Sequence, residues 1–102
     1  MKRTVEKIIA YAVEVAEPDK VILFGSVSRG TADVYSDLDV LIIAGEEADK
    51  KHISARVTRF AWELALKADV LVFSESEIAA GCEKPNSFLA SVLKDGKIVY
   101  QK

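Results

Sequence analysis

The chain has 102 residues, of which 50% are hydrophobic and 29% are charged, so its composition is that of one folded globular domain with a small core. A formal net charge of −2 and the lack of a long Lys/Arg block argue against a protein that holds nucleic acid through its phosphates. A single cysteine, Cys82, excludes an internal disulfide, and no apolar run is long enough to span a membrane, so the expected compartment is the cytoplasm.

The first predicted helix covers Thr4–Glu17. Its apolar residues recur every three or four positions and therefore share one face. Tyr11 and Val15 widen this face, either for packing within the domain or for an interface. Pro18 stops the helix, and the β-branched run Lys20–Phe24 is predicted to be a buried strand.

This strand ends in Gly25-Ser26, where the chain is expected to turn into a helix N-terminus. Free backbone N–H groups at such a terminus favour an anion, and the hydroxyl of Ser26 adds a further donor. Arg29 is a candidate phosphate contact, and Gly30 is expected to end the short helix or turn. These residues predict a cradle for phosphate groups.

Two carboxylates, Asp37 and Asp39, lie two residues apart at the start of the next predicted strand, Leu38–Ala44. The two-residue period of a strand sends both to one face. Oxygen ligands in this arrangement suit a magnesium ion that also holds substrate phosphates. Because Gly25 ends one strand at this site and Asp37 leads into the other, the two strands must run antiparallel.

A long helix is predicted after Asp49, which can cap its N-terminus. Its apolar face is formed by Ile53, Val57, Phe60, Ala61 and Leu64. Trp62 is expected to pack near the edge of this face, whereas His52 is expected to be solvated.

The third predicted strand, Ala68–Phe73, is reached from Leu38–Ala44 through this helix. Such a crossover makes the two strands parallel. Parallel neighbours begin at the same end of a sheet, so Asp69 is expected beside Asp37 and Asp39 as a third carboxylate.

The rest of the chain is predicted to contain a short helix that starts at Ser74-Glu75 and is ended by Gly81, a turn at Pro85-Asn86, a helix Ser87–Lys94 and an edge strand Lys97–Tyr100. Residues 1–102 are therefore expected to form one α/β domain. Its core is a small mixed sheet of three or four strands, with helices chiefly on one face.

Gly25-Ser26, ten intervening residues and then Asp37-x-Asp39 resemble the signature of the DNA polymerase beta nucleotidyltransferase superfamily, and within it the minimal nucleotidyltransferases. The resemblance covers the motif and, through length and element order, nearly the whole chain, and it implies the polymerase beta-like core. The chain departs from the pattern at Val27, where many members carry a basic residue, so one expected phosphate contact is missing.

The resemblance implies an enzyme that transfers a nucleoside monophosphate, with AMP from ATP expected, to a hydroxyl acceptor. Gly25-Ser26 and Arg29 would bind the phosphates. Asp37 and Asp39 would ligate magnesium, with two ions expected and manganese as the alternative. Asp69 would hold the second ion and help to deprotonate the acceptor.

Minimal members are typically encoded beside a helical HEPN-domain protein in a toxin–antitoxin pair, and the resemblance implies neutralisation of such a toxin by transfer of AMP to a tyrosine. Two alternatives stay open. One is a non-catalytic module that neutralises its partner by contact, which Val27 keeps open, and the other is a transferase to a small-molecule alcohol. A mean hydropathy of +0.14 is high for so small a domain and predicts exposed apolar surface for a partner or for a homo-oligomer.

Overall fold

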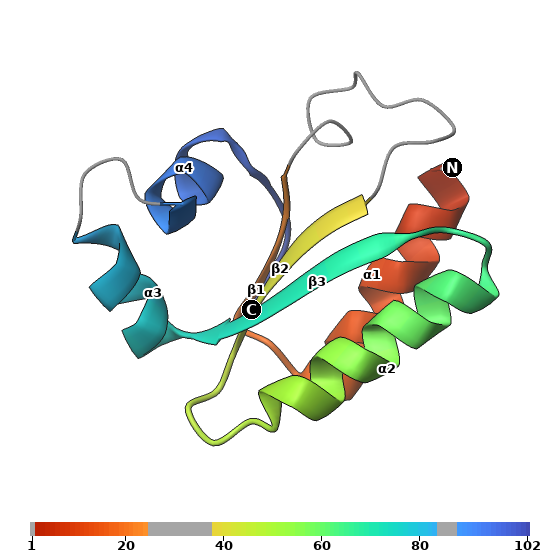
Figure 1. The fold of residues 1–102 in the computed structure, drawn as a ribbon, viewed down its shortest axis with the longest axis horizontal. Coiled ribbons are helices and arrows are strands. Elements are labelled where there is room, and N and C mark those ends of the chain that lie inside the picture. Colours follow the sequence, from red (N-terminus) through yellow and green to blue (C-terminus); the bar gives the residue numbers. More distant parts are fainter. Residues whose placement is uncertain (1, 25–37, 84–87) are drawn as a thin grey trace.

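The computed structural model describes residues 2–24, 38–83 and 88–102, which form a four-stranded mixed sheet of order β3-β2-β1-β4 (Figure 1). Its strands are β1 (Lys20–Phe24), β2 (Leu38–Ala44), β3 (Ala68–Ser74) and β4 (Lys97–Gln101). β1 is antiparallel to β2 and β4, and β2 is parallel to β3. The predicted α/β fold, the antiparallel first pair and the parallel crossover are confirmed.

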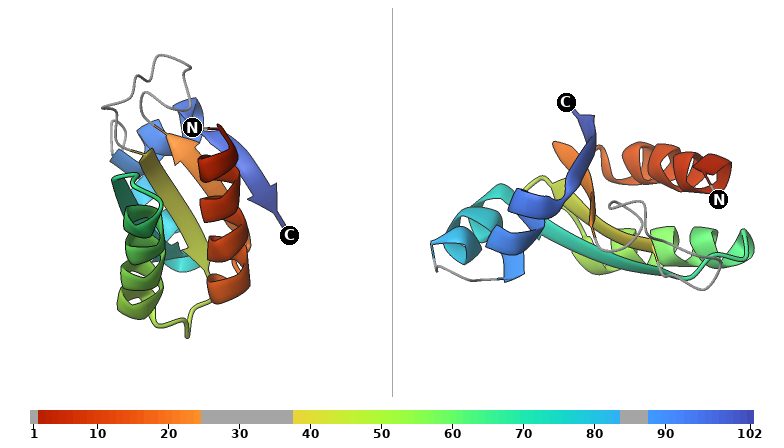
Figure 2. Two further views of the ribbon diagram at one scale, coloured as in Figure 1. Left: turned by 90° about the vertical axis from the view of Figure 1, so that its right-hand side faces the viewer. Right: turned by 90° about the horizontal axis from the view of Figure 1, so that it is seen from above.

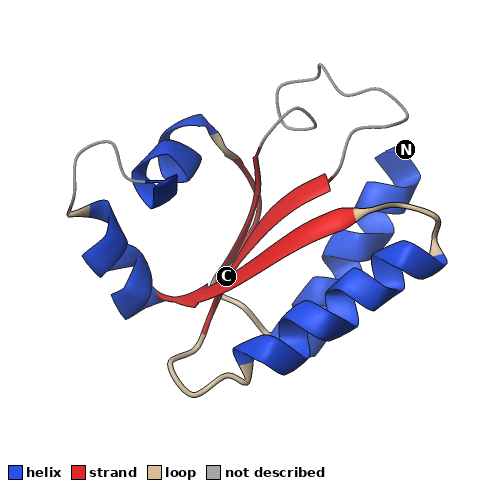
Figure 3. Cartoon of the chain, viewed as in Figure 1, coloured by secondary structure: helices blue, strands red, loops and turns tan. Residues whose placement is uncertain are grey.

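The described helices are α1 (Lys2–Ala16), α2 (Lys50–Glu63), α3 (Glu75–Cys82) and α4 (Phe88–Asp95). α1 and α2 cover one face of the sheet, and α3 and α4 lie against the other (Figures 2 and 3). Helices therefore cover both faces rather than chiefly one. Within the described ranges, no helix is long and apolar enough to cross a membrane.

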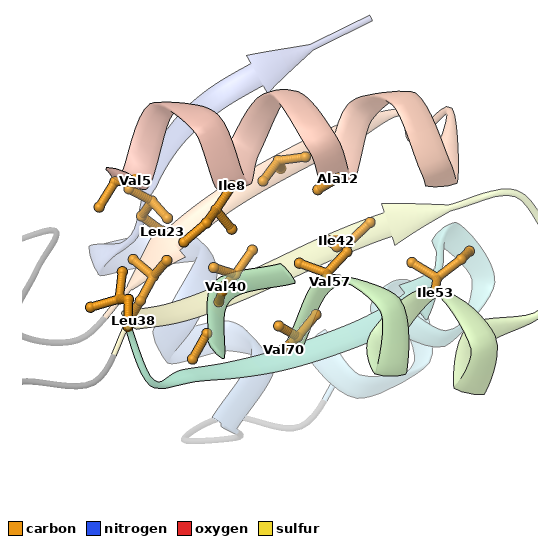
Figure 4. Packing of buried hydrophobic residues seen from close by; sticks show 14 of the residues in the cluster. Val5, Ile8, Ala12, Leu23, Leu38, Val40, Ile42, Ile53, Val57 and Val70 are labelled. Atoms are coloured by element: carbon orange, nitrogen blue, oxygen red, sulfur yellow. The ribbon is translucent and has the colours of Figure 1, made fainter. Parts of the chain in front are cut away.

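The larger core lies between the sheet and the α1–α2 pair, as Figure 4 shows. Ile8 from α1 and Val57 from α2 are fully buried against Val40 and Ile42 of β2. The alternate residues of β2, Leu41 and the half-buried Asp39 among them, belong to the other face. Because each fully buried aliphatic side chain contributes about 1.5–3 kcal/mol, both faces of β2 stabilise the fold.

α1 and α2 also pack directly on each other. The rings of Tyr11 and Phe60 are stacked, with centroids 4.3 Å apart and planes 10° from parallel. Val15 is half-buried and packs against the same core. The widened apolar face of α1 therefore serves packing within the domain, the first of the two alternatives.

The expectation that Trp62 packs near the apolar edge of α2 is wrong, because its side chain is 71% exposed. Its neighbour Ala61 is fully buried. One residue further along a helix means a rotation of about 100°, which turns Trp62 away from the sheet. His52 is exposed, as expected.

The predicted cap of α2 is confirmed, since the carboxylate of Asp49 accepts a hydrogen bond from the backbone N–H of His52 at 3.1 Å. At the other end Ala65 adopts a left-handed conformation, with φ of 61°. The N–H of Leu66 donates to the carbonyl of Ala61, and that of Ala65 to the carbonyl of Trp62, both at 2.9 Å. This is a Schellman motif in which alanine occupies the position usually held by glycine.

α3 begins where the sequence predicts, in a capping box formed by Ser74 and Glu77. It does not end at Gly81, however, because the helix continues to Cys82. A Cβ at Gly81 would collide with the side chain of Leu89 in α4. Gly81 therefore serves the close approach of α3 and α4 rather than a helix stop. The predicted stop at Gly30 and the turn at Pro85-Asn86 lie outside the described residues.

Candidate functional site

Two of the predicted carboxylates face each other across the parallel strand pair. Asp39 of β2 lies in register with Asp69 of β3, and on its other side Asp39 pairs with Phe24, the last residue of β1. These three residues, Phe24, Asp39 and Asp69, form a line across the sheet, which we call the carboxylate row after its two aspartates. Neighbouring strands lie about 4.8 Å apart, so the two aspartates are close neighbours.

The carboxylate row belongs to the face of the sheet that α3 and α4 cover. Leu41 and Ile43 follow Asp39 at the strand period, as Leu71 and Phe73 follow Asp69, and all four pack in the smaller core with α3 and α4. Asp39 is half-buried, whereas Asp69 is exposed. The row therefore lies where this smaller core ends and meets solvent.

The register is fixed beside the row. The backbone N–H of Leu38 donates to the carbonyl of Lys67 at 2.9 Å, which ties the first residue of β2 to the residue before β3. Leu38 is fully buried and Ala68, its partner across the pair, is 7% exposed. A slip by one residue would move the buried side chains of β3 to the other face, so packing also resists it.

The remaining predicted site residues, Gly25, Ser26, Arg29 and Asp37, lie outside the described residues. The structure describes both flanks of that segment. The chain leaves the sheet at Phe24 and returns to it at Leu38, and these residues lie in or beside the carboxylate row. Phe24 is a neighbour of the site that the sequence reasoning did not single out, although it is the last residue of the predicted strand.

Asp39 and Asp69 offer oxygen ligands on one face, which suits a hard cation such as magnesium. Within residues 2–24, 38–83 and 88–102, no group of three or more His, Cys, Asp or Glu side chains comes together as a metal site. Asp37, the third predicted ligand, lies outside the described residues. The donor set is therefore compatible with the predicted ion.

Carboxyl groups with shifted pKa values lie at the opposite end of the sheet. Glu46 accepts hydrogen bonds from the side chain and backbone of Ser76 at 2.9 and 3.1 Å, which lowers its pKa. A hydrogen bond from Lys50, whose Nζ lies 2.6 Å from Oε1 of Glu77, and a bond from the Ser74 N–H lower the pKa of Glu77. These contacts tie the N-terminus of α3 to the segment after β2, so they are structural.

Comparison with known proteins gives a family match over nearly the whole chain. The family model described as "Polymerase beta, Nucleotidyltransferase" matches residues 6–102. A curated protein of Methanocaldococcus jannaschii, named "Putative protein adenylyltransferase", is 43% identical over 54 residues, which are 53% of this chain and 54% of the relative. The chain thus matches about half the length of that curated relative.

Solved structures with the same fold include a crystal structure of a toxin–antitoxin with AMP-PNP, with a TM-score of 0.66 at 20% identity over 95% of this chain and 73% of that one. A "putative nucleotidyltransferase" from Sulfolobus solfataricus has a TM-score of 0.66 at 21% identity, covering 100% of this chain and 81% of its own. A complex of the tri-AMPylated Shewanella oneidensis HEPN toxin with MNT antitoxin has a TM-score of 0.56 at 16% identity. The match covers 98% of this chain and 69% of that one. At these identities the similarity establishes the fold.

Proposed function

The chain belongs to the polymerase beta nucleotidyltransferase family, and from this premise we propose that it transfers AMP from ATP to a hydroxyl group of a partner protein. The acceptor that we propose is a tyrosine of a helical HEPN-domain toxin, which would make the chain its antitoxin. Two solved neighbours support this choice, one a toxin–antitoxin with AMP-PNP and the other containing an AMPylated HEPN toxin. The observation that carries the proposal is the opposition of Asp39 and Asp69 in a chain of this family.

In the proposed reaction, Gly25-Ser26 and Arg29 bind the phosphates of ATP. The acceptor hydroxyl gives its proton to the carboxylate of Asp69, and its oxygen bonds to the α-phosphorus. The bond between the α-phosphorus and the bridging oxygen breaks, and pyrophosphate leaves with the electron pair. The product is an AMP ester of the acceptor.

Asp37, Asp39 and Asp69 are the residues that would hold magnesium, for which manganese is the alternative. The bound ion would offset the charge of the phosphates and favour ionisation of the acceptor hydroxyl. The chain's own contribution is to hold two carboxylates at one level of adjacent strands before any ligand arrives. This pre-organisation lowers the cost of assembling the site.

Transfer is tested with the proposed partner, a HEPN-domain protein that the proposal expects to be encoded beside this chain. The two proteins are incubated with ATP labelled on the α-phosphate and with magnesium, and the intact mass of the partner is measured. The expected result is addition of AMP by the wild type and none by Asp69→Asn or Asp39→Asn. An unmodified partner with the wild-type protein would refute the proposal.

A second candidate function is that of an antitoxin that acts by contact alone. Val27, which stands where many family members carry a basic residue, keeps this candidate open. A contact antitoxin needs to bind the toxin but not to modify it. The same samples separate the two functions, since an unmodified yet neutralised toxin, with Asp69→Asn as effective as the wild type, would favour contact alone.

A further inference from the structure

The outward side of α2 is basic although the chain as a whole is acidic. Residues 50–67 contain five basic side chains and one acidic one, whereas the whole chain has a formal net charge of −2. Lys50 is engaged with Glu77. The other basic side chains of α2, which belong to Lys51, Arg56 and Arg59, are exposed. This side of the molecule therefore attracts acidic groups.

Arg56, Arg59 and Trp62 follow one another at a spacing of three residues and so form one oblique ridge on α2. We call them the Arg-Trp ridge. Trp62 is 71% exposed, and the side chain of Arg59 is 82% exposed. Glu63 lies 3.4 Å from Arg59, but water screens such an exposed pair to little net stabilisation, so a stronger carboxylate partner can displace it.

A pocket of about 250 Å³ adjoins the ridge in the groove between α1 and α2. It is lined by the stacked rings of Tyr11 and Phe60 and by Arg56, Arg59 and Glu63. The guanidinium carbon of Arg56 lies 5.8 Å from the centroid of the Tyr11 ring. Aromatic walls beside two guanidinium groups suit an apolar side chain that is flanked by a carboxylate.

The Trp62 end of the ridge lies toward the same end of the domain as the carboxylate row. α2 runs toward this end, and residues 64–67 lead from it directly into β3, whose second residue is Asp69 (Figure 1). Trp62 therefore stands near the end of the sheet that carries Asp39 and Asp69. A partner bound to the ridge could reach the candidate site around the end of the sheet while α1 and α2 keep their packing on the core.

We propose that the Arg-Trp ridge and the adjoining pocket dock an acidic amphipathic helix of the partner protein and so present its hydroxyl to the carboxylate row. The proposal rests on the proposed function for the identity of that partner, the HEPN-domain acceptor. A helix fits because two helices already form a groove that a third can follow. One apolar side chain of the partner enters the pocket, another covers Trp62, and carboxylates between them meet Arg56 and Arg59. An exposed tryptophan flanked by arginines has the composition of an interface hot spot.

Trp62 is the chain's one tryptophan, so labelling with 5-fluorotryptophan gives a single fluorine resonance that reports on the ridge. The labelled protein is titrated with the unlabelled HEPN-domain protein, without ATP. The expected result is a shifted and broadened resonance. Charge reversal in Arg56→Glu/Arg59→Glu should weaken the affinity, measured by calorimetry, at least tenfold.

The matched control is Lys97→Glu/Lys102→Glu, which reverses two charges on and beside β4, at the opposite edge of the sheet from β3. This control should keep the wild-type affinity. An unmoved resonance, or equal affinity of the wild type and the arginine variant, would overturn the docking proposal. The proposal would also be overturned if single-stranded RNA, or a higher concentration of the protein alone, shifted the fluorine resonance in the same way.

Mass analysis of the same samples after addition of ATP and magnesium separates this proposal from the proposed function. Transfer of AMP without any change at Trp62 would leave the function standing and refute the docking surface. Docking that depends on Arg56 and Arg59, without transfer of AMP to the partner, would support the docking surface and refute the proposed function.

Discussion

Asp39 and Asp69 lie directly opposite each other on the parallel strands β2 and β3. Their strands are held about 4.8 Å apart by backbone hydrogen bonds, so the backbones of the two aspartates cannot separate without disrupting the sheet. Like charges that face each other across a strand pair destabilise it. A cation bound between them turns this repulsion into an attraction.

Asp69→Asn should therefore have opposite effects with and without metal. Without metal, the variant should be as stable as the wild type or slightly more so, because one of two like charges is gone. With magnesium, the melting temperature of the wild type should rise and that of Asp69→Asn should not. Thermal unfolding with EDTA and with MgCl2 makes this comparison. Glu14→Gln, an exposed isosteric change on α1, should respond to magnesium as the wild type does. A large loss of stability of Asp69→Asn in EDTA would instead indicate a structural role.

Gly96→Ala should destabilise the fold by about 1–3 kcal/mol. A Cβ at Gly96 would lie 2.5 Å from the carbonyl oxygen of Val92 and 2.6 Å from a methyl carbon of Ile22, where α4 ends against β1. The backbone cannot yield easily, because the Gly96 N–H donates to the Val92 carbonyl at 2.7 Å. Urea unfolding measures the loss. Gly45→Ala is the matched control, since a Cβ there meets nothing within 4 Å, and equal stabilities of the two variants would contradict the packing argument.

Ala65→Gly should stabilise the protein by about 0.5–1 kcal/mol, against the usual cost of adding a glycine. Ala65 has a φ of 61°, which strains an L-residue but not glycine. The Schellman hydrogen bonds do not involve its side chain and should persist. Urea unfolding should show a higher midpoint with an unchanged slope. Ala55→Gly, at an exposed position inside α2, should lose about 1 kcal/mol, and a loss of the same size at Ala65 would contradict the prediction.

Ser76→Ala should destabilise the protein at pH 7 and progressively less at acid pH. The hydroxyl of Ser76 is the main cause of the lowered pKa of Glu46, whose ordinary value is 4.5. A carboxyl whose pKa is lowered by folding stabilises the fold above its ordinary pKa, and that contribution disappears as the pH falls through the folded value. The gap between wild type and variant should therefore narrow below about pH 4.5. Melting temperatures between pH 3 and pH 7 measure it. Ser91→Ala on α4 should show no such dependence, and a constant gap for Ser76→Ala would refute the linkage.

The strands could be predicted because the sequence marks their ends. Lys20–Phe24 and Leu38–Ala44 are apolar runs between turn residues, and the observed bounds of β1 and β2 are the predicted ones. The crossover through α2 made Asp69 a neighbour of Asp39. Their direct opposition also depends on the hydrogen bond from the Leu38 N–H to the Lys67 carbonyl, which no local sequence pattern predicts.

Two side-chain environments could not be predicted, for different reasons. Trp62 adjoins a buried residue in the sequence, and only the rotation of α2 against the sheet decides that it faces solvent. Gly81 could have ended a helix or allowed close packing, and the choice depends on Leu89, which reaches it from another helix. The roles of Gly25, Ser26, Arg29 and Asp37 remain predictions from the motif.

During synthesis β1 is made long before β4, the strand with which it pairs on one side. β1 pairs with β2 on one side, and among the described residues its other side pairs with β4, residues 97–101, which are translated long after it. At roughly 5–20 residues per second, the first three strands can assemble seconds before the fourth exists. During that interval the outer edge of a strand with three buried aliphatic residues, Val21, Ile22 and Leu23, is open to another nascent chain. Residues 20–24 are therefore a segment that a ribosome-associated chaperone can protect until β4 is made.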